Sequence, residues 1–321
     1  MLPSPRSRPS LRAGIAALSV LLATLVVGSS SGSAEAVTPR DWGVALPGVP
    51  GDLSALSSLS SALADQPGTV MWYDAWSNKT AFPVASANAV AATGSDVAVT
   101  WEPWDPARGT VQRAYTTNRI ASGAFDRYLR TYAASVRSYG KPVTIRFAHE
   151  MNGSWYPWSA GVNGNTAADY VAAFRHVHGV FAAAGVTNVT WAWVPNVPYA
   201  GSTSLASLYP GDAFVDEVGL DGYNWGTTQT WSAWQTFWQV FGPGVAQLQA
   251  LTSRPIWLGE VGSTETGGDK AAWVGDMFAT LAAHPEVRGF TWFSYDKETD
   301  WRIDSSPASL DAFRAGLATY Q

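Results

Sequence analysis

A run of chemically active side chains stands near the middle of the sequence, in RFAHEMNGSWYPW at residues 146–158. The apolar segment PVTI just before it is typical of a buried strand, so these side chains stand where a strand ends. Glu150 could donate and accept protons there, and Trp155 and Trp158 could bind the flat face of a ligand such as a sugar. The alternative is a strand that runs out into a polar surface loop.

A second glutamate, Glu260, follows another apolar run in PIWLGEVGS at residues 255–263. Glycosidases that retain anomeric configuration use two carboxyl groups about 5–5.5 Å apart, one as nucleophile and the other as acid and then base. Proximity also drives the two pKa values apart, so that one acid stays protonated while the other is ionised. Alone, either glutamate would be read as a surface acid. Together, among tryptophans, Glu150 and Glu260 favour catalysis.

Short apolar runs alternate with helical patterns along the chain, and these elements must position the two acids. The expected strands lie at residues 41–46, 69–76, 96–104, 142–150, 189–196, 217–225, 255–263 and 287–295. The expected helices include residues 124–140, 167–185, 270–284 and 309–320. Apolar strands alternating with helices indicate a parallel sheet and predict an α/β fold, a single-domain (β/α)8 TIM barrel. An open dinucleotide-binding sheet is disfavoured because no glycine fingerprint follows the first strand.

In such a barrel the active site lies where the strands end. The fourth and seventh expected strands face each other across the barrel, so Glu150 and Glu260 can point into one cleft. Other strand ends also carry functional-looking side chains, namely Asp74, Glu102, Asn196, Asp221, Tyr223 and Trp292. These positions favour the catalytic interpretation of residues 146–158.

Residues 1–36 are predicted to be a secretory signal peptide. The apolar run at residues 14–27 is too short to span a membrane, and it leads to the small-x-small cleavage signal Ala34-Glu35-Ala36. A positive segment precedes this run, with Arg6, Arg8 and Arg12. We therefore expect a secreted, extracellular protein whose catalytic barrel is residues 37–321.

The amino-acid composition excludes some classes of binding partner. The chain has no cysteine, so its core alone must stabilise it, and its length is ample for one large domain. A formal net charge of −5 argues against nucleic acid and anionic membranes. The 17 tryptophans, many in loop-like runs, suit a polysaccharide, because sugar rings have apolar faces. His176 and His178 face different ways on a helix and no HExxH motif occurs, so no metal or other cofactor is expected.

The sequence resembles glycoside hydrolase family 26, in a clan of barrel glycosidases whose acid/base follows the fourth strand and whose nucleophile follows the seventh. The resemblance covers essentially all of residues 37–321. RFAHEMNGSWYPW matches the family signature around its acid/base, with His149, Glu150 and Trp155 in register. This motif is highly specific.

Two further motifs carry the resemblance. The family's nucleophile lies in a Gly-Glu segment, which matches Glu260 in LGEVGS. Its Asp-x-Tyr motif matches Asp221 and Tyr223 in GLDGYNW.

The resemblance implies a role for each matching residue. Glu150 would protonate the leaving glycosidic oxygen and then activate water, while Glu260 would attack the anomeric carbon. Tyr223 would hydrogen-bond Glu260, and His149 would orient the site or contact the sugar. The remaining expected substrate contacts are Trp155, Trp158, Asp221, Trp292, Glu102, Trp104, Lys297 and Trp301. Arg146 and Asn152 either support these groups or are simply structural.

The family holds two main activities. Most members are endo-β-1,4-mannanases, and a smaller branch cleaves mixed-linkage β-1,3-1,4-glucan. The mannanases carry a histidine near the third strand, whereas this chain reads VAVTWEPW, with Glu102 and no histidine before His149. WEPW together with DKETDW at residues 296–301 resembles the glucan-active branch. The expectation is a retaining endo-β-glycanase that leans towards mixed-linkage glucan, with β-mannanase as the alternative.

A secreted sugar-binding barrel without activity is an alternative of a different class. The aromatic residues alone would serve it, whereas the presence of both Glu150 and Glu260 favours an enzyme. A barrel enzyme that acts on phosphorylated metabolites conflicts with the secretion signal and lacks a Gly-rich phosphate loop. We therefore expect a monomer that acts on a polysaccharide and has no nucleic-acid or membrane partner.

Overall fold

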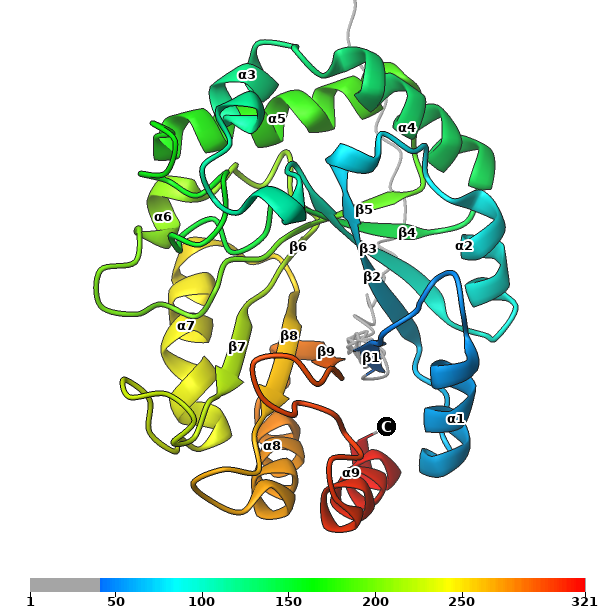
Figure 1. Ribbon diagram of the computed structural model, residues 1–321, viewed down its shortest axis with the longest axis vertical. Helices are drawn as coiled ribbons and strands as arrows, with labels where there is room; N and C mark the ends of the chain where they lie inside the picture. The colour runs from blue at the N-terminus through cyan, green and yellow to red at the C-terminus, as the bar shows by residue number, and fades with distance from the viewer. Residues whose placement is uncertain (1–40, 321) are drawn as a thin grey trace, which may run out of the picture. The chain divides into compact units, whose positions relative to one another are not determined.

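Parallel strands close into a barrel in the computed structural model, which describes residues 41–320 (Figure 1). The strands are β1 (Asp41–Ala45), β2 (Thr69–Ala75), β3 (Asp96–Glu102), β4 (Val143–Phe147), β5 (Val189–Trp193), β6 (Glu217–Val218), β7 (Asp221–Asn224), β8 (Ile256–Ser263) and β9 (Val287–Phe293). Each pairs in parallel with its neighbour, β1 pairs with β9, and β6 pairs with β8, so the sheet is closed. The predicted TIM barrel is confirmed, whereas the predicted signal peptide lies outside the described residues.

The predicted sixth strand is divided into β6 and β7, and both parts pair with β8. Gly219 lies at the break, where a Cβ atom would come within 2.0 Å of the Trp257 carbonyl oxygen. Only glycine can pass so close to a neighbouring backbone. The segment stays attached on its other side, because the Gly219 amide donates to the Trp193 carbonyl at 3.0 Å. After the break, Asp221 lies in register with Glu260.

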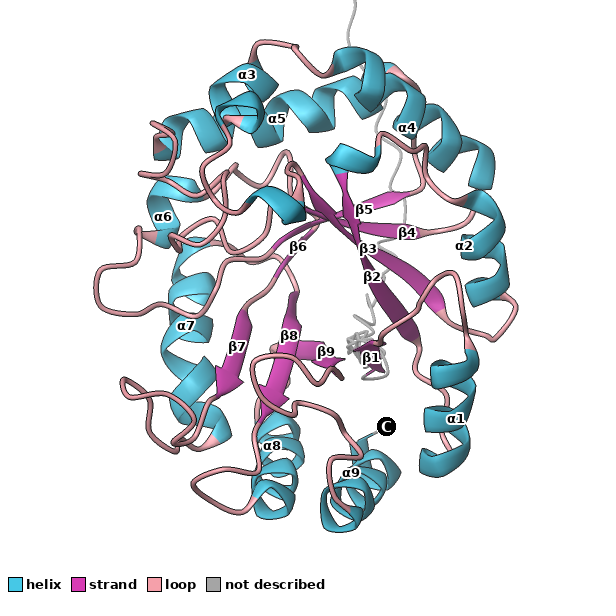
Figure 2. Ribbon diagram, in the orientation of Figure 1, coloured by secondary structure: helices cyan, strands magenta, loops and turns pink. Residues whose placement is uncertain are grey.

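Helices surround the strands (Figure 2). They are α1 (Ser54–Leu63), α2 (Val84–Ala91), α3 (Thr117–Ala121), α4 (Asp126–Tyr139), α5 (Ala167–Ala183), α6 (Leu205–Leu208), α7 (Phe237–Leu251), α8 (Lys270–Ala283) and α9 (Pro307–Tyr320). Short 3-10 turns are η1 (Trp76–Asn78), η2 (Pro106–Arg108) and η3 (Arg113–Tyr115). Capping boxes start two of the long helices, since Thr166 caps α5 and Thr236 caps α7. None of the helices in the described part of the chain could cross a bilayer.

Side chains alternate between two layers along each strand, as the pleat requires. On β9, Phe290 points outward and contacts Phe278 of α8 and Phe313 of α9. Phe293 lies three residues further along β9 and points inward, where it belongs to a small cluster inside the barrel with Met71. The last inward positions of the strands therefore form the floor of any site at the carboxyl end of the barrel.

Trp292 was predicted to be a sugar platform, and this prediction is wrong. Its ring is 0% exposed and packs edge-on against Trp273 of α8 and Phe313 of α9. Its Nε1 donates to the Trp301 carbonyl at 2.8 Å. Trp292 and Phe293 are adjacent aromatic residues, so only the phase of the strand decides which one faces the barrel interior.

Replacing Trp292 with alanine should therefore cost stability and not glycan affinity. A fully buried tryptophan that becomes alanine typically destabilises a protein by about 3–5 kcal/mol, because apolar contacts are lost and a cavity remains. Trp292→Phe should cost clearly less. Denaturant unfolding of the two variants checks this. A stable Trp292→Ala protein with weakened glycan binding would restore the platform role.

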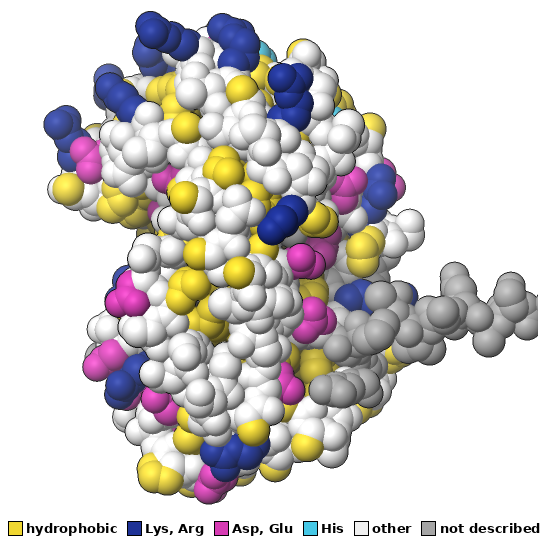
Figure 3. Space-filling model, turned by 90° about the vertical axis from the view of Figure 1, so that its right-hand side faces the viewer, with side chains coloured by type: hydrophobic (Ala, Val, Ile, Leu, Met, Phe, Trp, Pro, Cys, Tyr) yellow, Lys and Arg dark blue, Asp and Glu magenta, His cyan; other side chains and the backbone are white. Residues whose placement is uncertain are grey.

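Basic side chains gather at one end of the surface. Figure 3 shows several Lys and Arg side chains at the upper end of one face, whereas acidic and basic side chains are mixed below it. On α4, Arg127, Arg130 and Arg137 are all exposed. The net negative charge is therefore a property of the whole chain, and it argues less strongly against anionic partners at this end than elsewhere.

Candidate active site

A strained turn follows β4 and carries His149 and Glu150. Ala148 and Glu150 both have positive φ angles, 48° and 51°, in the left-handed region that residues with a Cβ rarely adopt. The turn is tied on both sides, because the Ala148 amide donates to the Trp101 carbonyl and the Glu150 amide to the Val194 carbonyl. Backbone strain persists only where surrounding structure holds it, and such positions cluster at functional sites.

Trp158 supports this turn from inside the protein. It is fully buried, its Nε1 donates to the His149 carbonyl at 2.7 Å, and its ring stacks on Tyr156 with centroids 4.3 Å apart. Trp104 packs edge-on against the rings of both Tyr156 and Trp158. The prediction that Trp158 contacts substrate is wrong, because its ring has no free face.

Hydrogen-bond donors surround the carboxylate of Glu260 on β8. Its Oε1 accepts from the Tyr73 hydroxyl at 2.7 Å and from the Arg146 guanidinium, and its Oε2 accepts from the Tyr223 hydroxyl. Burial alone would raise the pKa of Glu260, but the Arg146 charge and the two hydroxyls outweigh it and hold the pKa well below its usual value. Glu260 is therefore ionised at neutral pH, as a nucleophile must be.

Arg146 links Glu260 to a second buried acid. Its Nη1 donates to Asp221 Oδ1 at 2.6 Å, and its Nε donates to the Thr100 hydroxyl at 3.0 Å. Gly259 makes room for this contact, since a Cβ there would lie 2.6 Å from Arg146 Nη1. Asp221 was predicted to contact substrate, and this is wrong. Its side chain is fully buried and holds the guanidinium in place.

Glu150 has the opposite electrostatic environment. Its Oε2 accepts from the Trp155 Nε1 at 2.6 Å, and its side chain is otherwise buried. Burial and the negative charge of Glu260 raise the pKa of Glu150 well above that of an ordinary glutamate. The two acids are thus split, with Glu150 protonated and Glu260 ionised at neutral pH, which is the division of roles that acid and nucleophile need.

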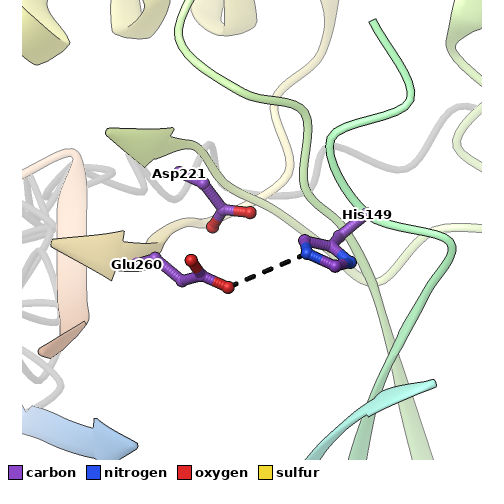
Figure 4. A group of neighbouring side chains, drawn as sticks. All are labelled: His149, Asp221 and Glu260. Carbon is purple, nitrogen blue, oxygen red and sulfur yellow. Dashed lines mark ion pairs between the residues drawn. The ribbon is translucent and has the colours of Figure 1, made fainter. Parts of the chain in front are cut away.

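His149, Asp221 and Glu260 form a group that could be considered for metal binding (Figure 4). Their ligand atoms lie within 4.8 Å of one another, and His149 Nε2 is 3.9 Å from Glu260 Oε1. However, the Arg146 guanidinium already contacts both carboxylates, and its charge repels a second cation. Burial and the same guanidinium lower the pKa of His149 well below its usual value, so the ring is neutral. The group suits hydrogen bonding better than metal binding.

A third acid, Glu102, points into the same region from the end of β3. It is buried, and burial raises its pKa to about 7, with a smaller effect from the charge of Glu260. Lys297 lies in the loop after β9, where it pairs with Glu298 at 2.8 Å and remains largely exposed. Both stay candidates for substrate contact, Glu102 from within the site and Lys297 from the surface.

Trp301 was also predicted to contact substrate, and this prediction is wrong. It is almost fully buried, and its ring lies behind Tyr223 with centroids 4.9 Å apart. Asn152 is structural as well. Its amide exchanges two hydrogen bonds with the Asn196 backbone, each 2.9 Å long, which tie the loop after β4 to the loop after β5.

Tyr73, which was not among the predicted site residues, donates directly to Glu260. The neighbouring Asp74 at the end of β2 was predicted instead, but its side chain points outward and accepts from the Tyr132 hydroxyl at 3.0 Å. The alternation of side chains along β2 could have identified Tyr73. Met71 faces the barrel interior, and Tyr73, two residues further on, faces the same way.

A closed (β/α)8 barrel that holds two buried carboxyl groups of opposed ionisation has the general arrangement of a barrel glycosidase. Comparison with known proteins places the chain more closely. The family model described as glycosyl hydrolase family 26 matches residues 116–255. The chain is also 39% identical over 269 residues to endoglucanase H of Acetivibrio thermocellus, a match that covers 82% of this chain. The chain belongs to glycosyl hydrolase family 26.

Other relatives are more distant. The chain is 34% identical over 111 residues to a mannan endo-1,4-β-mannosidase of Bifidobacterium adolescentis, which covers 32% of this chain and 11% of that protein. The chain spans 29% of endoglucanase H and 42% of a β-1,3-xylanase from Vibrio sp., so it corresponds to less than half of these curated relatives.

Solved structures share the fold. The catalytic domain of an endo-β-1,4-mannanase from Bacillus sp. JAMB-750 superposes with a TM-score of 0.65 at 21% identity, covering 87% of this chain and 86% of that one. A β-mannanase from Bacteroides ovatus gives a TM-score of 0.64 at 18% identity, covering 88% of this chain and 89% of that one. At this identity the likeness establishes the barrel alone.

The hydroxyl of Tyr73 should set the pH at which the site becomes active. A hydrogen bond to a charged group contributes about 1.5–3 kcal/mol, so Tyr73→Phe should raise the pKa of Glu260 by about 1–2 units. Activity that needs ionised Glu260 is lost as pH falls through this pKa, so the acid limb of kcat/KM should move to higher pH. The pH profile of glycan hydrolysis measures this.

Tyr199→Phe is the matched control, because Tyr199 lies on a loop and has no hydrogen bond to Glu260. Its acid limb should coincide with that of the unmodified protein. If Tyr73→Phe lowered kcat at every pH without moving the limb, Tyr73 would act by packing and not by tuning Glu260.

Proposed function

We propose that the protein is a secreted enzyme that hydrolyses internal bonds of plant-type β-glycans with retention of anomeric configuration. The observation that carries this proposal is the contrast between two buried glutamates: Glu260 accepts hydrogen bonds from Arg146 and two tyrosines, whereas Glu150 accepts one from Trp155. Family membership supports it, as does the exposed Trp155 beside Glu150. The predicted signal peptide supports secretion.

The proposed reaction begins with attack of the Glu260 carboxylate on the anomeric carbon, which breaks the glycosidic bond. Glu150 donates its proton to the leaving oxygen. Because Trp155 donates to Oε2 of Glu150, the carboxyl proton belongs on Oε1, which is then the oxygen that faces the glycosidic bond. The products of this step are a released sugar chain and a glycosyl ester on Glu260.

The second step follows from the first through electrostatics. Ester formation removes the negative charge of Glu260, and that charge is one of the causes of the raised pKa of Glu150. Glu150 therefore becomes a more stable carboxylate and can accept a proton from water as the water attacks the anomeric carbon. Glu260 leaves as a carboxylate, back in contact with Arg146 and the two tyrosines. No metal or other cofactor enters either step.

The two glutamates should respond differently to mutation. Glu260→Ala should lose nearly all turnover, because the ionised carboxylate that forms the ester is gone. Glu150→Ala should still form the ester from a substrate with a good leaving group and then stall for lack of a base. Azide needs no deprotonation, so it should restore turnover of Glu150→Ala with a β-glycosyl azide as product.

Proton NMR of the first product provides the second measurement, since retention gives the β-anomer first. Glu298→Ala serves as a control. Glu298 is a nearby acid that pairs with Lys297 and has no role in the proposed reaction, so this variant should still form and hydrolyse the ester. An α-anomer as first product, or full activity in either Glu150→Ala or Glu260→Ala, would mean that other carboxylates do the chemistry. No sugar release from any β-glycan would favour the binding-only alternative.

For the substrate, we propose mixed-linkage β-1,3-1,4-glucan, with β-1,4-mannan as the alternative. Glu102 occupies the end of β3, where the mannanases that the sequence resembles carry histidine. The relative named endoglucanase H matches 82% of this chain, whereas the mannosidase of Bifidobacterium adolescentis matches 32%. The mannan alternative is supported by several relatives that are named mannan endo-1,4-β-mannosidases.

Reducing-sugar release should therefore show a higher kcat/KM for barley-type β-glucan than for galactomannan. Glucomannan and β-1,3-xylan complete the comparison, the latter because one relative is named a β-1,3-xylanase. Glu102→His should lower kcat/KM for the glucan if this acid selects the sugar. A clear preference of the unmodified protein for galactomannan would overturn the choice of glucan and leave the mechanism standing.

A further inference from the structure

Exposed aromatic side chains gather at the end of the barrel that holds the two glutamates. Within residues 41–320, the markedly exposed large hydrophobic residues are Val111, Trp155 (40% exposed), Tyr199 (43%) and Trp231 (70%). All lie in loops that follow strands, after β3, β4, β5 and β7 respectively. Single exposed apolar residues are common on proteins, but their collection at one end marks a surface that contacts something.

Rings lead away from the two glutamates in two directions. Trp155, which donates to Glu150, stacks on Tyr199 with centroids 5.9 Å apart. From Tyr223, which donates to Glu260, ring contacts run on to the loop after β7. The rings in this second row are Tyr223, Trp225 and Trp231, with centroid spacings of 6.1 and 5.4 Å. Trp231 ends the row and is the most exposed aromatic ring among the described residues.

The loop that presents Trp231 is held by hydrogen bonds. Asn224 Oδ1 accepts from the amides of Gly226 and Gln235, which joins the two ends of the loop. Within it, the Ser232 hydroxyl donates to the Gly226 carbonyl at 2.8 Å. Gly226 has a φ of 51°, and a Cβ there would come within 1.9 Å of the Thr266 carbonyl. An exposed ring on such a loop is already ordered, so binding to it loses little conformational entropy.

We infer that Trp231 is the platform of a separate sugar subsite, which binds a unit of a long β-glycan away from the bond that is cleaved. A tryptophan face suits the apolar face of a pyranose ring, and the row from Tyr223 to Trp231 gives the chain a path from the nucleophile to this platform. This inference rests on the proposed β-glycanase function. It predicts that the enzyme prefers long chains, because only these reach both Trp231 and the glutamates.

Trp231→Ala tests the inference in two assays. In hydrolysis, KM for polymeric β-glucan should rise about tenfold, the usual effect of losing one well-placed aromatic contact, while kcat stays unchanged. With an aryl glycoside of a disaccharide from the same polymer, both constants should stay unchanged. Trp231→Phe should recover most of the affinity, and Arg127→Ala, which removes an exposed side chain on α4, should leave both assays unaffected.

The second assay is affinity electrophoresis of each variant in a Glu260→Ala background, in gels containing β-glucan or galactomannan. It reports binding without turnover, so it separates failure of the subsite from failure of the enzyme proposal. We expect the gel with one of the two polymers to retain Trp231→Ala less than it retains the protein that keeps Trp231. Equal retention with and without Trp231, or an equal loss on long and short substrates in hydrolysis, would overturn the inference.

Discussion

The buried guanidinium of Arg146 is the interaction on which the site depends. A charge in the interior of a barrel is costly unless it is paired, and Arg146 is paired with Asp221 and Glu260 and bonded to Thr100. Removing Arg146 would leave the buried carboxylates of Asp221 and Glu260 without a compensating charge. The space beside Gly259 and the break that puts Asp221 in register with Glu260 both serve this contact. The same buried contacts of Arg146 therefore hold the barrel interior together and position Glu260.

The same contact explains how two glutamates in one pocket acquire opposite properties. Arg146 and two tyrosine hydroxyls favour the charged form of Glu260, whereas Glu150 has a single indole donor and the negative charge of Glu260 nearby. Neither residue type nor burial distinguishes the two acids, since both are buried glutamates. The arrangement of donors around each carboxyl distinguishes them, and the charge of Glu260 adds to the effect of burial in raising the pKa of Glu150.

Sequence patterns predicted the strands of the barrel, and from them the pair Glu150 and Glu260, whose catalytic role stays a prediction. They failed where a decision depended on the phase of a strand. Barrel strands are covered on both faces, so their residues do not alternate between polar and apolar, and periodicity cannot tell inward from outward. For this reason Asp74 was chosen over Tyr73, and Trp292 was taken as exposed. The left-handed backbone at Glu150 was also invisible, because glutamate carries no preference for it.

Groups at strand ends and groups on loops are fixed by different contacts. The turn at Glu150 is bonded to the strands on both sides, so its geometry follows from the barrel itself. The loop with Trp231 is closed by its own side chains, chiefly Asn224 and Ser232. A change in that loop therefore leaves the hydrogen bonds that surround Glu150 and Glu260 in place. If Trp231 binds a glycan unit as we infer, that contact can change while the two acids keep their properties.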